Sequence, residues 1–113
     1  NGGISRTFFL SLGISQISTV IPNGYGLSQN YPNPFNPATK IRFSIPAGNN
    51  MNRNIDLSVF DITGRLVKHL ANEKLAPGVY EVDFNASELP SGVYFYRMNA
   101  GSYSETRKMI LLK

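Results

Sequence analysis

The sequence contains no cysteine and only one histidine, His69. Without cysteine the chain can form neither a disulfide nor a thiolate metal site, and it has no cysteine nucleophile. One histidine leaves no second imidazole for a metal pair or a catalytic relay. The apolar residues at 7–17 are interrupted by polar ones and fall short of the ~18 that a membrane span needs. We therefore expect no enzyme, no cofactor, no metal and no membrane span.

The charge pattern also excludes functions. The net charge of +4 comes from 11 basic and 7 acidic residues, and the basic residues are spread along the chain without a run of three. Nucleic-acid-binding surfaces usually concentrate basic residues on one element, so we expect no nucleic-acid partner. The acidic residues form no calcium-type loop, and there is no phosphate-binding glycine loop and no Gly-x-Ser-x-Gly motif.

Several short segments alternate apolar and polar residues, a period typical of strands that bury one face. Turns separate them. Asp61–Arg65 is expected to form a hairpin in which Asp61 bonds to the turn backbone, and Gly-Val-Tyr opens a strand at 78–80 and again at 92–94. Six or seven such strands predict an antiparallel β-sandwich. The residues expected on the buried faces are Ile41, Phe43, Ile45, Ile55, Leu57, Val59, Tyr80, Val82, Phe84, Tyr94, Tyr96 and Met98.

Residues 31–37, here called the leader, contain three prolines and two asparagines. Proline lacks an N–H group and drives the preceding residue towards extended geometry. The leader is therefore predicted to be extended and polyproline-like, and unable to join a central ladder. Its asparagine side chains can replace missing backbone bonds. Tyr31 and Phe35 are expected to anchor it on the sandwich.

Five stretches together resemble a known family: LSQNYPNPFNPATKIRFSIP at 27–46, LSVFDITGRLVKHL at 57–70, APGVYEVDF at 76–84, LPSGVYFYRM at 89–98 and TRKMILLK at 106–113. They look like the C-terminal sorting domain of type IX secretion cargo. They are also similar to the immunoglobulin-like domain of the flagellar hook-capping protein. The resemblance covers residues 27–113.

The resemblance implies an immunoglobulin-like sandwich of about seven strands in a non-catalytic sorting module. It implies passage through the periplasm to the outer cell surface or the extracellular space, with the secretion translocon and the surface-attachment machinery as partners. We expect recognition to involve the last strand and its end, 108–113, although residues 109–112 could equally be ordinary core. The family's pattern falls on Pro32, Asn33, Pro34, Gly64, Gly78, Gly92, Tyr94, Lys108, Ile110 and Lys113.

Residues 1–26 fall outside the resemblance and are expected to be a separate N-terminal strand with a Pro/Gly/Asn-rich connector. The predicted strand, about residues 4–14, has an apolar face that must be buried somewhere. It could fold back on its own sandwich, belong to an upstream domain, or add to a neighbour's sheet edge. The last arrangement propagates head to tail, so the alternative function is a homopolymeric extracellular fibre. The candidate donor residues are Ile4, Phe8, Leu10, Leu12 and Ile14.

Overall fold

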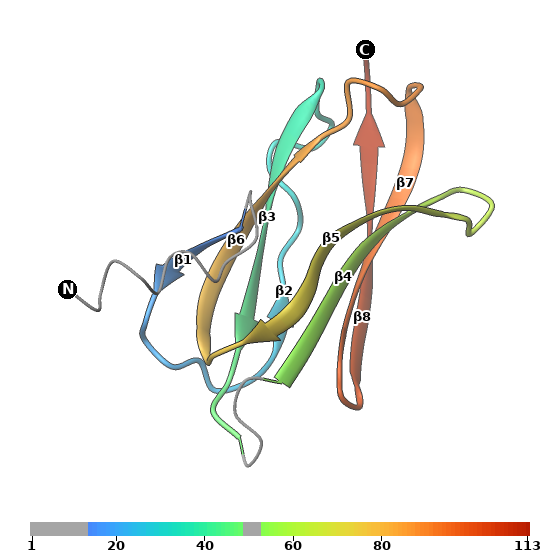
Figure 1. The fold of residues 1–113 in the computed structure, drawn as a ribbon. Coiled ribbons are helices and arrows are strands. Elements are labelled where there is room, and N and C mark those ends of the chain that lie inside the picture. Colours follow the sequence, from blue (N-terminus) through green and yellow to red (C-terminus); the bar gives the residue numbers. More distant parts are fainter. Residues whose placement is uncertain (1–13, 49–52) are drawn as a thin grey trace.

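The computed structural model describes residues 14–48 and 53–113, which form a sandwich of two four-stranded antiparallel sheets (Figure 1). One sheet has the order β1-β6-β3-β2 and the other the order β5-β4-β7-β8. The described residues contain no helix, and so none that could cross a membrane. The strands are β1 (Ile14–Ser18), β2 (Gly26–Leu27), β3 (Ala38–Ile45), β4 (Arg53–Asp61), β5 (Leu66–Leu75), β6 (Gly78–Asn85), β7 (Gly92–Ala100) and β8 (Tyr103–Leu111).

The predicted all-β sandwich is confirmed, and its buried faces follow the alternation in the sequence. In β3, Ile41, Phe43 and Ile45 are buried, whereas Lys40 and Arg42, which alternate with them, are exposed. The same alternation buries the predicted residues of β4, β6 and β7. A period of two forces alternate side chains onto opposite faces of a strand, so these positions can all reach one core.

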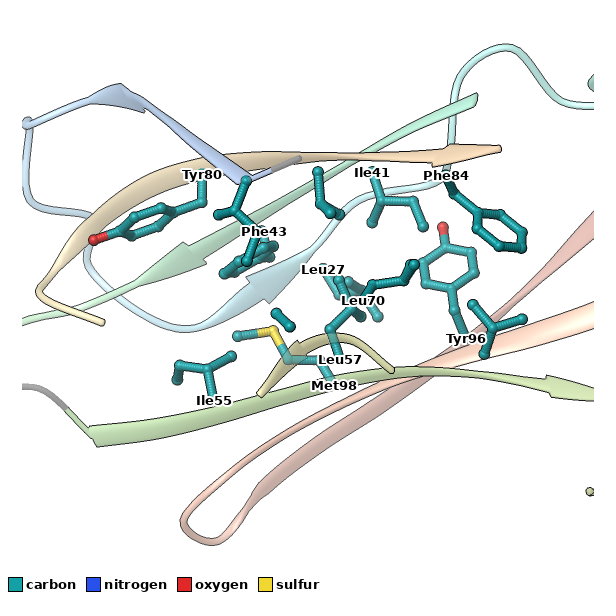
Figure 2. Packing of buried hydrophobic residues seen from close by; sticks show 14 of the residues in the cluster. Leu27, Ile41, Phe43, Ile55, Leu57, Leu70, Tyr80, Phe84, Tyr96 and Met98 are labelled. Carbon is teal, nitrogen blue, oxygen red and sulfur yellow. The ribbon is translucent and has the colours of Figure 1, made fainter. Parts of the chain in front are cut away.

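The core fills the space between the sheets (Figure 2). Phe43 of β3 stacks on Tyr80 of β6, with ring centroids 5.5 Å apart, and both face Ile55 and Met98 from the opposite sheet. Stacked aromatic pairs of this kind add roughly 0.5–1.5 kcal/mol to the effect of burial.

The β4–β5 hairpin forms as predicted. One carboxylate oxygen of Asp61 accepts hydrogen bonds from the backbone N–H groups of Thr63 (2.9 Å) and Arg65 (3.0 Å) and from the Thr63 hydroxyl (2.6 Å). Gly64 has φ +88°, a backbone conformation that glycine adopts without a steric cost. These bonds, first of all the one from the Thr63 hydroxyl, lower the pKa of Asp61 from 3.8 to about 2.

The N-terminal part of the described chain belongs to the β1-β6-β3-β2 sheet. β1 pairs with β6, with Ile14 opposite Val82, and Ile14 is buried. The two-residue strand β2 spans the predicted boundary between residues 26 and 27, and both of its residues pair with β3. Of the candidate donor residues only Ile14 is described, and it packs in its own chain; Ile4, Phe8, Leu10 and Leu12 lie outside the described residues.

Candidate recognition surface

The leader bends rather than running straight. The three bonds that precede its prolines are cis, and its backbone bends at 32–34 and again at 36–37. The predicted extended, polyproline-like conformation is therefore wrong. Of the two expected anchors, Phe35 is confirmed, since its side chain is 2% exposed. Tyr31 is 81% exposed, so its predicted role as an anchor is wrong.

The bend is held by Asn30 and Thr39, two buried polar residues on either side of the leader. The Asn30 side-chain amide donates to the Pro32 carbonyl (3.1 Å) and to the Thr39 hydroxyl (3.1 Å), which itself donates to the Pro32 carbonyl (2.8 Å). A buried polar group is costly unless it is paired, and this network pairs both residues. The bonds pull Pro32 towards β3 and prevent an extended path.

Tyr96 of β7 fixes residues 28–30, which precede the leader. Its hydroxyl donates to the Ser28 carbonyl (2.6 Å) and accepts from the Asn30 N–H (2.8 Å). Burial raises the pKa of Tyr96 to about 12. The alternation in β7 predicts Tyr96 in the core, but this second role of Tyr96 and the roles of Asn30 and Thr39 are not predicted from the sequence. The expected local bonding of asparagine side chains is the nearest signal.

The leader covers the free edge of β8, the last strand of its sheet. Phe35 N–H donates to the Ile110 carbonyl (2.9 Å), and the Phe35 carbonyl accepts from Leu112 N–H (3.0 Å). The Asn33 side-chain oxygen accepts from Ile110 N–H (3.0 Å), and the Gln29 amide donates to the Lys108 carbonyl (2.7 Å). An uncovered edge strand invites pairing with another chain; here the outward backbone groups of 108–112 are largely satisfied.

The C-terminal residue is held as well. Lys113 N–H donates to the Ser91 hydroxyl (3.0 Å), and its ammonium group donates to the Ser87 carbonyl (2.6 Å). In the β7–β8 ladder, Gly92 lies opposite Leu111 and Tyr94 opposite Met109. The end of β8 is therefore enclosed by β7 on one side, the leader on the other and the 85–91 loop beyond. We call this arrangement the clasp: the leader, the 85–91 loop and residues 108–113.

Most of the predicted recognition residues meet in or beside the clasp. They are Pro32, Asn33 and Pro34 in the leader, Lys108, Ile110 and Lys113 at the chain end, and Gly92 and Tyr94 on the paired strand. Met109 and Leu111 are core residues, Ile110 is partly buried, and Leu112 is exposed, so the last strand combines both interpretations that the sequence left open.

The two remaining glycines lie elsewhere. Gly64 is in the β4–β5 hairpin. Gly78 begins β6, whose opposite end reaches the leader. A Cβ atom on Gly78, at φ +150°, would lie 2.3 Å from the Gln16 side-chain nitrogen and 3.0 Å from the Ser18 carbonyl oxygen. Gly78 is thus required for the close approach of β1 to β6.

A groove of about 290 Å³ separates the β4–β5 hairpin from the start of β7. Ile62, Leu89 and Val93 supply its apolar walls, and Asp61 and Arg65 lie at its polar side. The Tyr94 hydroxyl donates to the Pro90 carbonyl (2.7 Å) and so fixes the loop that forms one wall. The groove brings together two sequence motifs that are thirty residues apart.

The geometry around His69 does not form a catalytic relay. Both Ser58 Oγ (2.8 Å) and Asp56 Oδ1 (3.3 Å) approach the same ring nitrogen, Nδ1. In a relay the acid and the nucleophile bind opposite nitrogens of the imidazole. Within residues 14–48 and 53–113, no group of three His, Asp or Glu side chains could hold a metal ion.

Comparison with known proteins gives a family and a weak structural likeness. No curated protein matches the chain. The crystal structure of a conjugative transposon lipoprotein from Bacteroides eggerthii is similar with a TM-score of 0.42 and 11% identity, over 91% of this chain and 100% of that one; so low a score establishes no relationship. The model of the secretion system C-terminal sorting domain matches residues 29–112. That match spans the leader and all but the last residue of the clasp, and the chain belongs to the secretion system C-terminal sorting domain family.

Proposed function

We propose that the clasp is the surface by which the type IX secretion machinery recognises this chain. As a member of its family, the chain is a sorting signal for that system, which exports through the outer membrane to the cell surface or the extracellular space. The proposal concerns which residues are read, and it places them at the junction of the leader with the end of β8.

The observation that carries the proposal is the hydrogen bonding between the leader and β8. Asn33 and Phe35 bond to Ile110 and Leu112, residues that lie at the other end of the sequence. These bonds fix the course of the last strand while leaving the side chains of Lys108 and Leu112 exposed. A rigid, preorganised surface loses little conformational entropy on binding, and this one presents a fixed pattern of cations and apolar side chains.

We also propose that this chain is itself non-catalytic and acts as an address for attached cargo. The Ser58–His69–Asp56 cluster lacks relay geometry, and the family is in general non-catalytic. The machinery that attaches exported cargo to the surface would then act after recognition, on the chain delivered by the translocon.

A secretion assay tests the proposal. The full chain is fused behind a reporter in a host that has the machinery, and reporter is measured in the periplasm and outside the cell. Lys108→Glu combined with Lys113→Glu should retain most of the reporter in the periplasm, because both exposed cations of the clasp become anions. Lys74→Glu, on an exposed β5 residue outside the clasp, should export normally. Unimpaired export of the double variant would contradict the proposal.

A further inference from the structure

The two outer faces of the sandwich differ in character. On the β1-β6-β3-β2 sheet the centre of the outward surface carries two ion pairs between β3 and β6: Lys40 pairs with Asp83 at 2.6 Å and Arg42 with Glu81 at 3.0 Å. On the β5-β4-β7-β8 sheet, by contrast, one end of the outward surface is apolar. We call this region the apolar face; it consists of Phe60, Ile62, Leu66, Val93, Phe95 and Ile110.

The strand register makes the apolar face continuous. Phe60 lies opposite Leu66 on one side and Phe95 on the other, and Val93 lies opposite Ile110 in the adjoining row. Their chain neighbours, such as Val59 and Tyr96, point into the core and are fully buried. Leu66 is nevertheless 48% exposed and Ile62 71% exposed. Contiguous exposed apolar surface on a soluble domain indicates an interaction site.

The groove extends the apolar face. Ile62 and Val93 belong to both, and the groove runs between the hairpin and residues 89–94, where the 85–91 loop leads into β7. Its turns are fixed by the Asp61 hydrogen bonds and by the bond from Tyr94 to Pro90. A concave, pre-formed apolar site suits a protruding apolar side chain of a protein partner.

Asp61 beside the groove is neutralised by its ion pair with Arg65, and the charges next to the apolar face that lack such a partner are positive. The Arg97 guanidinium lies 4.6 Å from the centroid of the Phe60 ring, and Lys108 lies opposite Phe95. Neither side chain forms an ion pair with a described residue. Two copies docked through this face would bring like charges together, which is unfavourable. Anionic membranes are recognised by clusters of about four to eight Lys or Arg residues, more than the two unpaired cations here.

We propose that the apolar face and its groove dock a protein component of the secretion machinery that presents apolar side chains flanked by carboxylates. The inference rests on the proposed function and adds to it a second contact surface, which shares with the clasp only Lys108, Ile110 and residues 89–91 of the loop. Contact at both surfaces would orient the whole domain rather than only its last strand.

Two exposed apolar residues that form none of the clasp's hydrogen bonds, Ile62 and Leu66, allow a selective test. Ile62→Ser combined with Leu66→Ser should lower export of the reporter fusion roughly ten-fold, because apolar anchors at the centre of an interface carry much of the binding energy. Val20→Ser combined with Ile21→Ser is the matched control, since Val20 is 74% and Ile21 49% exposed on the connector between β1 and β2. The control should export like the parent, and all purified variants should unfold at the same temperature.

Direct contact is tested by placing a photo-crosslinking amino acid at Leu66 and, as control, at Ile21. A crosslink to a component of the secretion machinery from position 66 alone would support the inference. Binding of the purified chain to vesicles of 30% phosphatidylglycerol in phosphatidylethanolamine, abolished by Leu66→Ser, would overturn it in favour of a lipid surface. Parental export by the Ile62/Leu66 double variant would overturn this inference alone. Retention of the parent fusion would overturn the proposed function and this inference with it.

Discussion

At the scale of single residues, the structure is determined by a few polar groups with several partners each. Asp61 accepts hydrogen bonds from two backbone N–H groups. The Tyr96 hydroxyl bonds to one carbonyl, that of Ser28, and to one N–H group, that of Asn30, just ahead of the leader. Each of these residues closes a turn or fixes a loop that no strand pairing would fix. Substitutions at these positions therefore have effects that their burial alone does not predict.

Asp61 makes stability depend on pH in the acid range. Its pKa is lowered to about 2 in the folded chain, from 3.8, so the ionised form is the one that folding favours. Its contribution is fully present well above pH 3.8 and is lost as the pH falls towards 2. We expect the difference in urea midpoint between the wild type and Asp61→Asn to be constant from pH 5 to 7 and to shrink between pH 4 and 2. A difference that does not change with pH would show that the carboxylate charge is immaterial.

Tyr96→Phe should destabilise the fold by about 1–3 kcal/mol, because it leaves the buried Asn30 N–H without a partner and removes a partly buried bond to the Ser28 carbonyl. Urea unfolding monitored by circular dichroism measures this loss. Tyr25→Phe is the control: Tyr25 is stacked on Tyr103, with ring centroids 4.9 Å apart, and its hydroxyl forms no hydrogen bond with a described residue. Equal effects of the two substitutions would contradict the role assigned to the Tyr96 hydroxyl.

At the scale of elements, short segments cover the edges of the long strands. The leader supplies the outer partner of β8, and β1 supplies a partner for β6 that depends on a glycine. In both cases a short segment with little pairing of its own covers the edge of a longer strand. Loss of such a segment would remove its core side chain, Phe35 of the leader or Ile14 of β1, and would expose an edge to other chains.

Asn33→Ala should increase amide hydrogen exchange at Ile110 while leaving Leu112 protected, because only the Ile110 N–H bonds to the Asn33 side chain. Nuclear magnetic resonance measures both amides in one experiment. Asn36→Ala provides the control, since Asn36 also precedes a proline but its side chain forms no hydrogen bond with a described residue. Equal protection of Ile110 in the two variants would mean that the Asn33 contact is not maintained in solution.

Gly78→Ala should loosen β1. The new methyl group would meet the Gln16 side chain and the Ser18 carbonyl at a positive φ, and such backbone strain costs on the order of 1–3 kcal/mol. Faster amide exchange across residues 14–18, with a lower unfolding temperature, is the expected result. Gly24→Ala should leave both unchanged, because a Cβ atom there has no neighbour within 4 Å.

At the scale of the whole molecule, the sequence predicts what depends on local pattern. The alternation in β3 and β6 and the turn residues around Asp61 allow the strands, the hairpin and the sandwich to be inferred. The bent path of the leader is different, since it depends on Asn30, Thr39 and Tyr96, the last contributed from a distant strand. No local rule separates the buried Phe35 from the exposed Tyr31. Both are aromatic residues next to a proline, and their burial differs because of their tertiary contacts.

The hydrogen bond between Asn33 and Ile110 joins positions 77 residues apart. A receptor that binds this junction would not bind a short linear peptide from either segment, even one of identical sequence. Such a receptor would recognise tertiary structure. Cargo whose sorting domain is misfolded would then not be bound and would not enter the translocon.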